Sequence, residues 1–321
     1  MKRGGCRAQV SPAFWTRPTV QCIPSLVLIF VAAGCSGGRI QDPEDPGTED
    51  FEGRDGHYTV SSFQSAARGR VHFTVYLPPA WTPDGTEAYP LIIFLHGQTG
   101  DEFRFPDNVP VSDLNQWIGE GAVPPFVLIA PRGADEIGTV RWYHTPNVLL
   151  LTSDDPSELR AFCWRRFRAG GSSNSLSVHG HSRGASGALH FALNYPDKFA
   201  SSVANAFVSD YVLEALKTSA SENRERILTA GIRLRMIIGP EDSFVLNDGR
   251  IGSPAMHLHL DSLGIPHEYE VLPGVTHSFS SLWNYQRPDG LQSGLYELQF
   301  HARAWNGHPS IAGGPQGATI Q

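Results

Sequence analysis

Cysteine is scarce in this chain of 321 residues, which contains only Cys6, Cys22, Cys35 and Cys163. We predict that the first two leave with a cleaved N-terminal segment and that Cys35 lies at the cleavage site. Cys163 then remains alone, which excludes an intramolecular disulfide and a zinc–cysteine cluster. Within ELRAFCWRRF, Cys163 is expected to be a buried helical residue.

Positive charge is also in short supply outside the N-terminus. Residues 1–34 contain four basic residues and no acidic one, whereas the rest of the chain carries 21 Lys and Arg against 32 Asp and Glu. The remainder therefore has a formal charge of −11. An acidic body repels nucleic acid and anionic lipid surfaces, so we expect no nucleic-acid partner.

The longest apolar run, IPSLVLIFVAAGC at residues 23–35, follows the basic segment. It is too short to span a bilayer comfortably and suits the apolar region of an export signal. Its end, VAAGC, resembles a bacterial lipoprotein signal, in which the cysteine, here Cys35, is lipidated and becomes the mature N-terminus. The alternative is an ordinary secretory signal in which Cys35 is incidental. We expect an exported protein, either secreted or held at the membrane surface by a lipid anchor.

The composition divides the chain into four parts. Residues 1–34 are predicted to be the signal peptide, and residues 35–56 a flexible linker because they are rich in Gly, Pro, Asp and Glu. Residues 57–305 contain the apolar segments of a single folded domain. Residues 306–321 are predicted to be a disordered tail.

Phosphate-binding and dinucleotide-binding motifs are absent from the sequence, so no cofactor is expected. Two histidine pairs, His179/His181 and His257/His259, raise the question of a metal. Neither pair has an evident set of carboxylates beside it in sequence, and two imidazoles alone are weak ligands. We therefore expect no metal site.

What the chain does contain is an alternation of strands and helices. YTVSSFQS and VHFTVYLPP predict an antiparallel hairpin, and YPLIIFLHG, PPFVLIAPRG, NSLSVHG and IRLRMIIG read as strands buried on both faces. Helical patterns lie between them, in SDLNQWIGEG, DPSELRAFCWRRF, GASGALHFALNYP and SPAMHLHLDSLG. The pattern predicts an α/β fold with a mainly parallel sheet, whose ligands bind beyond the carboxyl ends of the strands.

A Gly-His-Ser-Arg-Gly stretch, Gly180 to Gly184, follows one of these strands. The pattern G-x-S-x-G is weak alone, but a strand before it and a helix after it are the context of a nucleophile elbow. Ser182 would then be exposed at a helix N-terminus, where developing negative charge is favoured. The alternative is a tight turn with a capping serine.

A serine nucleophile needs a base and a group that orients the base. Asp242 follows the strand IRLRMIIG, and His277 follows a later strand and a Pro-Gly turn, so the order is Ser, acid, His. We predict His277 as the base and Asp242 as the acid. Glu241 is the main rival for the acid, and Asp248 lies a little further on.

The oxyanion of the reaction would need two amide donors. We predict the backbone N–H of Gln98, in the loop after FLHG, and that of Arg183, directly after the nucleophile. His96 precedes the serine in the chain and is expected to orient this loop. Trp142 and Tyr143, in GTVRWYHTPNVLLL, are candidates to stack on a substrate, although simple packing of a long loop explains them equally well.

Taken together, VHFTVYLPPAW, YPLIIFLHG, VHGHSRGASGALHFALNYPDKFASSVA and LGIPHEYEVLPGVTHSF resemble the esterase D and feruloyl esterase-like group of α/β-hydrolases. Polyhydroxybutyrate-depolymerase-like esterases and mycolyltransferases are relatives of that group. The resemblance covers about residues 58–285. It implies an α/β-hydrolase fold and hydrolysis of carboxylic esters by Ser182, His277 and Asp242. Relatives often have GHSMGG at the elbow, so Arg183 and Ala185 are departures that bear on substrate class more than on mechanism.

The sequence therefore predicts an exported serine esterase that acts through an acyl-enzyme on a small-molecule or polymer-linked ester. The same site would also serve an acyltransferase or a serine peptidase. A third possibility, from another class, is an inactive surface-binding lipoprotein on a hydrolase scaffold.

Overall fold

A computed structural model describes residues 51–133, 141–208, 210–242 and 252–305. The predicted signal peptide, Cys35, most of the predicted linker and the predicted tail lie outside these residues. Within them, every helix is too short or too polar to cross a bilayer. Phe51 is buried and its ring packs edge-on against Phe167, with centroids 5.0 Å apart. Residues 51–56, which the composition assigned to the linker, therefore include a side chain of the core.

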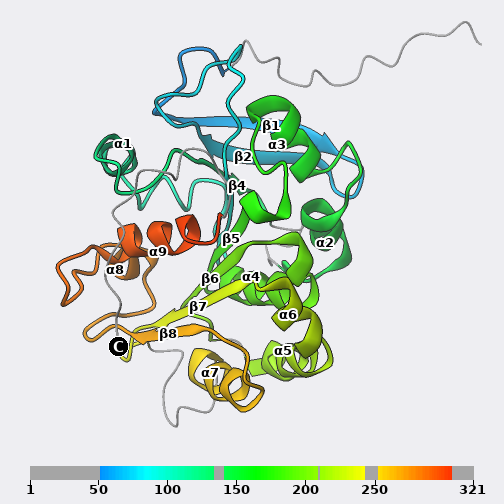
Figure 1. Ribbon diagram of the computed structural model, residues 1–321, viewed down its shortest axis with the longest axis vertical. Helices are drawn as coiled ribbons and strands as arrows, with labels where there is room; N and C mark the ends of the chain where they lie inside the picture. Colours follow the sequence, from blue (N-terminus) through cyan, green and yellow to red (C-terminus); the bar gives the residue numbers. More distant parts are fainter. Residues whose placement is uncertain (1–50, 134–140, 209, 243–251, 306–321) are drawn as a thin grey trace, which may run out of the picture. The chain divides into compact units, whose positions relative to one another are not determined.

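Eight strands form one sheet in the order β1-β2-β4-β3-β5-β6-β7-β8 (Figure 1). The first two pair antiparallel, as the hairpin pattern predicts, and β2 also pairs antiparallel with β4. The remaining pairs are parallel. The strands are β1 (Tyr58–Ser65), β2 (Gly69–Tyr76), β3 (Leu91–Leu95), β4 (Val127–Pro131), β5 (Leu176–His181), β6 (Ser201–Asn205), β7 (Arg233–Ile238) and β8 (Glu268–Val271).

The helices of the described residues cover both faces of this sheet (Figure 1). They are α1 (Val111–Gly119), α2 (Thr145–Thr152), α3 (Leu159–Phe167), α4 (Arg183–Asn194), α5 (Asp210–Glu222), α6 (Arg224–Ala230), α7 (Gly252–Ser262), α8 (Phe279–Trp283) and α9 (Ser293–Ala302). One core cluster contains residues of α2 to α7, and another contains residues of α1, α8 and α9.

The two cores explain why the central strands read as continuous apolar runs. Along β3, Ile93 belongs to the core under α2 to α7, and its neighbours Ile92 and Phe94 belong to the core under α1, α8 and α9. Alternate side chains of a strand point to opposite faces, so both faces need apolar residues when both are covered. This arrangement is the α/β-hydrolase type of fold that the sequence predicts. Cys163 is a buried free cysteine on α3, also as expected.

Candidate active site

Ser182 lies at the sharp turn between β5 and α4. Its backbone has φ 58° and ψ −115°, a region that residues other than glycine rarely occupy. The turn is held by two backbone hydrogen bonds: Ser182 N–H donates to the carbonyl of Asn205 (2.8 Å), and Ser186 N–H donates to the carbonyl of Ser182 (3.2 Å). The strand–turn–helix context that the G-x-S-x-G motif requires is therefore present.

The two glycines of the motif allow strand and helix to approach closely. A Cβ on Gly180 would lie 2.0 Å from the carbonyl oxygen of Gly184, and one on Gly184 would lie 1.8 Å from that of Leu95. Neither separation is physically possible, so any side chain here would push α4 away from β3 and β5. The strained turn at Ser182 depends on this close contact.

His277 connects Ser182 to a buried carboxylate. Its Nε2 lies 2.9 Å from Ser182 Oγ, and its Nδ1 lies 2.6 Å from Asp242 Oδ2. Because a carboxylate only accepts hydrogen bonds, Nδ1 carries the proton and the Nε2 lone pair faces the serine hydroxyl. The Asp242 side chain is fully buried, whereas 19% of the His277 side chain is exposed. These are the geometry and the ordering of a Ser-His-Asp triad.

Asp242 reaches His277 because two loops cross without a side chain between them. A Cβ on Gly239, just after β7, would lie 1.9 Å from the carbonyl oxygen of Val275, which belongs to the loop that carries His277. The predicted rival Glu241 is exposed, and the side chain that meets His277 is that of Asp242. Asp248 lies outside the described residues.

His181 and Asn205, which were not predicted to belong to the site, hold the backbone of His277 and Ser182. His181 Nε2 lies 3.2 Å from the carbonyl oxygen of His277, and Asn205 supplies the carbonyl that accepts the Ser182 N–H. Burial, with a smaller contribution from the neighbouring His277, lowers the pKa of His181 to about 3. His181 is therefore neutral at pH 7 and donates Nε2–H to the backbone of His277. Its place directly before the nucleophile was the one available sequence signal.

His96 holds the loop after β3, as predicted, and Trp142 is part of the same arrangement. His96 Nδ1 is 2.8 Å from the Gly97 carbonyl, and its Nε2 accepts the N–H of Gly133 (2.9 Å). Burial is the main cause that lowers the pKa of His96 to about 4. Trp142 donates its indole N–H to the His96 carbonyl (2.9 Å) and is completely buried. A Trp142 enclosed in this way has no face for a substrate, so the stacking role proposed for it does not fit the structure.

The other predicted residues lie near the elbow or behind it. A Cβ on Gly97 would lie 3.1 Å from that of Ser182, so the backbone that leads to Gln98 passes beside Ser182. Gln98 is exposed, and Arg183 is the half-buried first residue of α4. Tyr143 is half-buried and packs against the core of α2 to α7.

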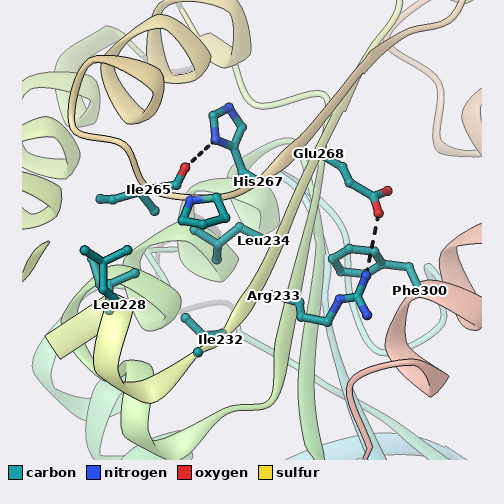
Figure 2. Close-up of a pocket in the computed structure, with 11 residues that line it drawn as sticks. Leu228, Ile232, Arg233, Leu234, Ile265, His267, Glu268 and Phe300 are labelled. Atoms are coloured by element: carbon teal, nitrogen blue, oxygen red, sulfur yellow. Dashed lines mark hydrogen bonds and ion pairs between the residues drawn. The ribbon is translucent and has the colours of Figure 1, made fainter. Parts of the chain in front are cut away.

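A cavity of about 310 Å³ is lined by residues at the start of β7 (Figure 2), whereas Asp242 follows the last residue of that strand. Its lining includes Leu228, Leu234, Ile265 and Phe300, together with Arg233 at the first position of the strand. In parallel sheets ligands bind at the carboxyl ends of the strands, and this cavity is at the amino ends. It is therefore separate from the site of Ser182.

The family comparison covers the segment in which these residues lie. The family model described as "Putative esterase" matches residues 65–284, which include Ser182, Asp242 and His277. No relative of significant similarity is found among curated protein sequences.

Solved structures with the same fold are numerous and distant in sequence. A ferulic acid esterase is 15% identical and has a TM-score of 0.59, with 78% of this chain and 98% of that chain covered. The S954A mutant of the feruloyl esterase module from Clostridium thermocellum, complexed with sinapinate, is 14% identical with a TM-score of 0.56, over 86% and 96% of the two chains. An S-formylglutathione hydrolase from Agrobacterium tumefaciens is 21% identical with a TM-score of 0.55, over 78% and 95%.

These similarities establish the fold, and the family model covers well over half of the chain. With a serine, a histidine and a carboxylate in hydrogen-bonding order at the strand ends, the chain belongs to the esterase family, a family of carboxylic ester hydrolases.

Proposed function

We propose that the protein is an exported serine esterase in which Ser182 is the nucleophile, His277 the general base and Asp242 the group that orients the base. The observation that carries the proposal is the continuous contact from Ser182 Oγ to His277 Nε2 and from His277 Nδ1 to Asp242. His277 accepts the hydroxyl proton as Ser182 Oγ attacks the ester carbonyl carbon. The ester C–O bond then breaks, and His277 returns the proton to the leaving alcohol.

The backbone N–H groups of Gln98 and Arg183 are proposed to bind the oxyanion. Arg183 begins α4, and the N–H groups of a first helical turn point out of the helix toward the end where Ser182 lies. The close approach of Gly97 to Ser182 supports the assignment of Gln98, because it brings the backbone before Gln98 next to the nucleophile. Water then attacks the acyl-enzyme along the same route, with His277 again as the base, and releases the acid.

Ser182→Ala tests the proposal. The untagged protein and this variant are assayed with p-nitrophenyl esters from acetate to long chains and with methyl ferulate and methyl sinapinate, the latter two because of the fold relatives. We expect turnover to fall by about 10⁴-fold or more in the variant, with an unchanged thermal midpoint. A fluorophosphonate probe should label only the unmutated protein, because only an activated serine reacts. Hydrolysis that survives the substitution would disprove the assignment.

The outcomes also distinguish two of the alternatives that the sequence leaves open, the acyltransferase and the binding protein. Serine-dependent release of alcohol with transfer of the acyl group to an added alcohol acceptor identifies an acyltransferase. An unlabelled Ser182 without turnover of any ester points to a binding protein on a hydrolase scaffold.

Export is the second part of the proposal, and it rests on the basic segment and the apolar run that ends at Cys35. We expect the chain, expressed in a bacterial host, to incorporate labelled palmitate and to sediment with membranes. Cys35→Ala should abolish both while Ser182-dependent hydrolysis is retained. Release of an unlabelled, processed protein by the unmutated chain would favour the ordinary secretory signal instead.

A further inference from the structure

Three metal-ligating side chains meet between α7 and β8, away from Ser182. His257 and Asp261 lie four residues apart on α7, a spacing that places both on one helical face. His267 comes just before β8. His257 Nδ1 is 2.8 Å from His267 Nε2, and the Asp261 carboxylate lies 3.5 Å from His257 Nε2 and 3.8 Å from His267 Nε2. One donor atom from each residue lies within 4.8 Å of the others.

A hydrogen bond to the backbone fixes the orientation of the His267 ring. Its Nδ1 lies 2.8 Å from the backbone carbonyl of Ile265, and both residues line the cavity in Figure 2. The carbonyl accepts the Nδ1–H, so the Nε2 lone pair points toward His257. Only 2% of the His267 side chain is exposed. A backbone carbonyl that holds the remote N–H of an imidazole is the usual support of a metal-ligating histidine.

The donors and acceptors of the cluster do not match unless one additional positive charge is present. Because His267 Nε2 accepts, His257 Nδ1 must donate to it. In the neutral imidazole the other nitrogen of His257 is then a lone pair, which faces the Asp261 carboxylate, a second acceptor. Two acceptors that face each other are unfavourable unless a positive charge lies there. Either His257 carries an additional proton, or its single proton moves to Nε2 and faces Asp261 while a metal ion takes its place between His257 Nδ1 and His267 Nε2.

We propose that His257, Asp261 and His267 form a binding site for a divalent transition metal ion, zinc in particular. Two imidazoles and one carboxylate suit zinc, which takes nitrogen ligands at about 2.0–2.1 Å and carboxylate oxygens at about 2.0–2.2 Å. Tetrahedral ligand atoms at such distances are about 3.3 Å apart. The separations of 2.8 and 3.8 Å in the cluster bracket this value. The Asp261 side chain is 60% exposed, so water can complete the coordination.

The position of the site indicates what the ion does. Helix α7 follows Asp242 in the chain, and β8 precedes His277. An ion held by His257, Asp261 and His267 joins α7 to the residue before β8 and uses none of Ser182, Asp242 and His277. The site is therefore structural, and it stabilises the folded state in proportion to the ion bound.

Calorimetric titration of the untagged full chain with ZnCl₂, after treatment with EDTA and dialysis, tests the site. We expect one zinc ion per chain with a rise in the thermal midpoint. In Asp261→Asn the affinity for zinc should fall at least about tenfold, and in His257→Gln the binding of this one zinc ion should be lost. The ester turnover of both metal-free variants should equal that of the metal-free unmutated chain. CoCl₂ as a second probe should give the visible absorption of a tetrahedral Co²⁺ site in the unmutated chain only.

Two control variants locate the ion. His259→Gln lies on the same helix, but His259 contacts the Lys217 carbonyl and Ser221 Oγ, so zinc binding should persist. Persistence in His277→Ala excludes zinc held by the triad histidine. Zinc binding that is unchanged in both Asp261→Asn and His257→Gln, or no binding by the unmutated chain, would overturn the proposal. The second result would leave the cluster as a proton-bridged pair.

Discussion

Two histidine–carboxylate pairs, His277–Asp242 and His179–Glu297, invite comparison, because only in the first does the histidine contact the hydroxyl of Ser182. His277 and Asp242 are 2.6 Å apart at the carboxyl ends of the strands. His179, on β5 three residues before Ser182, lies 3.1 Å from Glu297 of α9. The chemical groups are nearly the same, so the surroundings must decide what each pair does.

The pairs differ in exposure and in the partners of their remaining atoms. The His277 side chain is 19% exposed and presents Nε2 to Ser182 Oγ. The side chains of His179 and Glu297 are at most 1% exposed, and Glu297 accepts hydrogen bonds from Asn205 Nδ2 (2.8 Å) and Ser293 Oγ (3.1 Å). A pair with all its acceptors occupied inside the core is suited to stability, and a pair that leaves one lone pair toward a hydroxyl is suited to catalysis.

Asp242→Asn should have the largest effect on turnover. We expect kcat for p-nitrophenyl acetate to fall by about 10⁴-fold, because the amide favours the wrong histidine tautomer. Glu241→Gln is the matched control, since Glu241 is adjacent and exposed, and its turnover should change less than about twofold. Steady-state kinetics of both variants check the prediction. A larger loss in the Glu241 variant would transfer the role of the acid to Glu241.

Glu297→Ala should reverse the pattern, with a large effect on stability and a small one on turnover. The substitution leaves Asn205 Nδ2 and Ser293 Oγ buried without their acceptor. We expect the free energy of unfolding to fall by about 3–5 kcal/mol, measured by urea denaturation. Turnover per folded molecule at low temperature should change less than about tenfold. A stable variant with a 10³-fold lower kcat would show that this pair also takes part in catalysis.

Acid should destabilise the fold through its buried histidines. Burial is the main cause that lowers the pKa of His96 and His190 to about 4 and that of His181 to about 3. Below a pH of about 6.5 these histidines bind protons in the unfolded chain but remain neutral in the folded protein. The free energy of unfolding therefore decreases as the pH falls toward 4. Each histidine contributes about 1.4 kcal/mol per pH unit in this window.

Urea denaturation at pH 7, 6 and 5 measures this dependence. His190→Gln removes one of the titrating groups, so its stability should depend on pH less steeply by about one histidine's share. His190 is outside the site, which makes it a suitable choice. A free energy of unfolding that is constant from pH 7 to pH 5 would contradict the prediction.

The predicted elements that match best are those with strong local signals. The strands in YPLIIFLHG, PPFVLIAPRG and IRLRMIIG and the helix after Ser182 were recognised because apolar runs and glycine turns delimit them. Strand β6, SSVAN, was not recognised because its polar side chains are buried by partners far away in the chain. Ser201 Oγ, for example, is within hydrogen-bonding distance of Ser177 Oγ and His301 Nδ1. Helix α2 was missed in a segment that was interpreted as a loop.

The sequence by itself determined the strand–turn–helix at Ser182, because glycine sterics and local apolar patterns are properties of neighbouring residues, and it fixed the chain order of Ser182, Asp242 and His277. Only the tertiary structure showed that the carboxylate that contacts His277 is Asp242 and not Glu241, since adjacent side chains differ in direction and that of Asp242 is buried against His277. The same holds for Trp142. Its sequence context suggested a contact with substrate, but in the structure it is buried and its indole N–H donates to the His96 carbonyl. It also holds for His257, whose partner proved to be His267 across α7 and β8, because packing and not sequence distance brings side chains together.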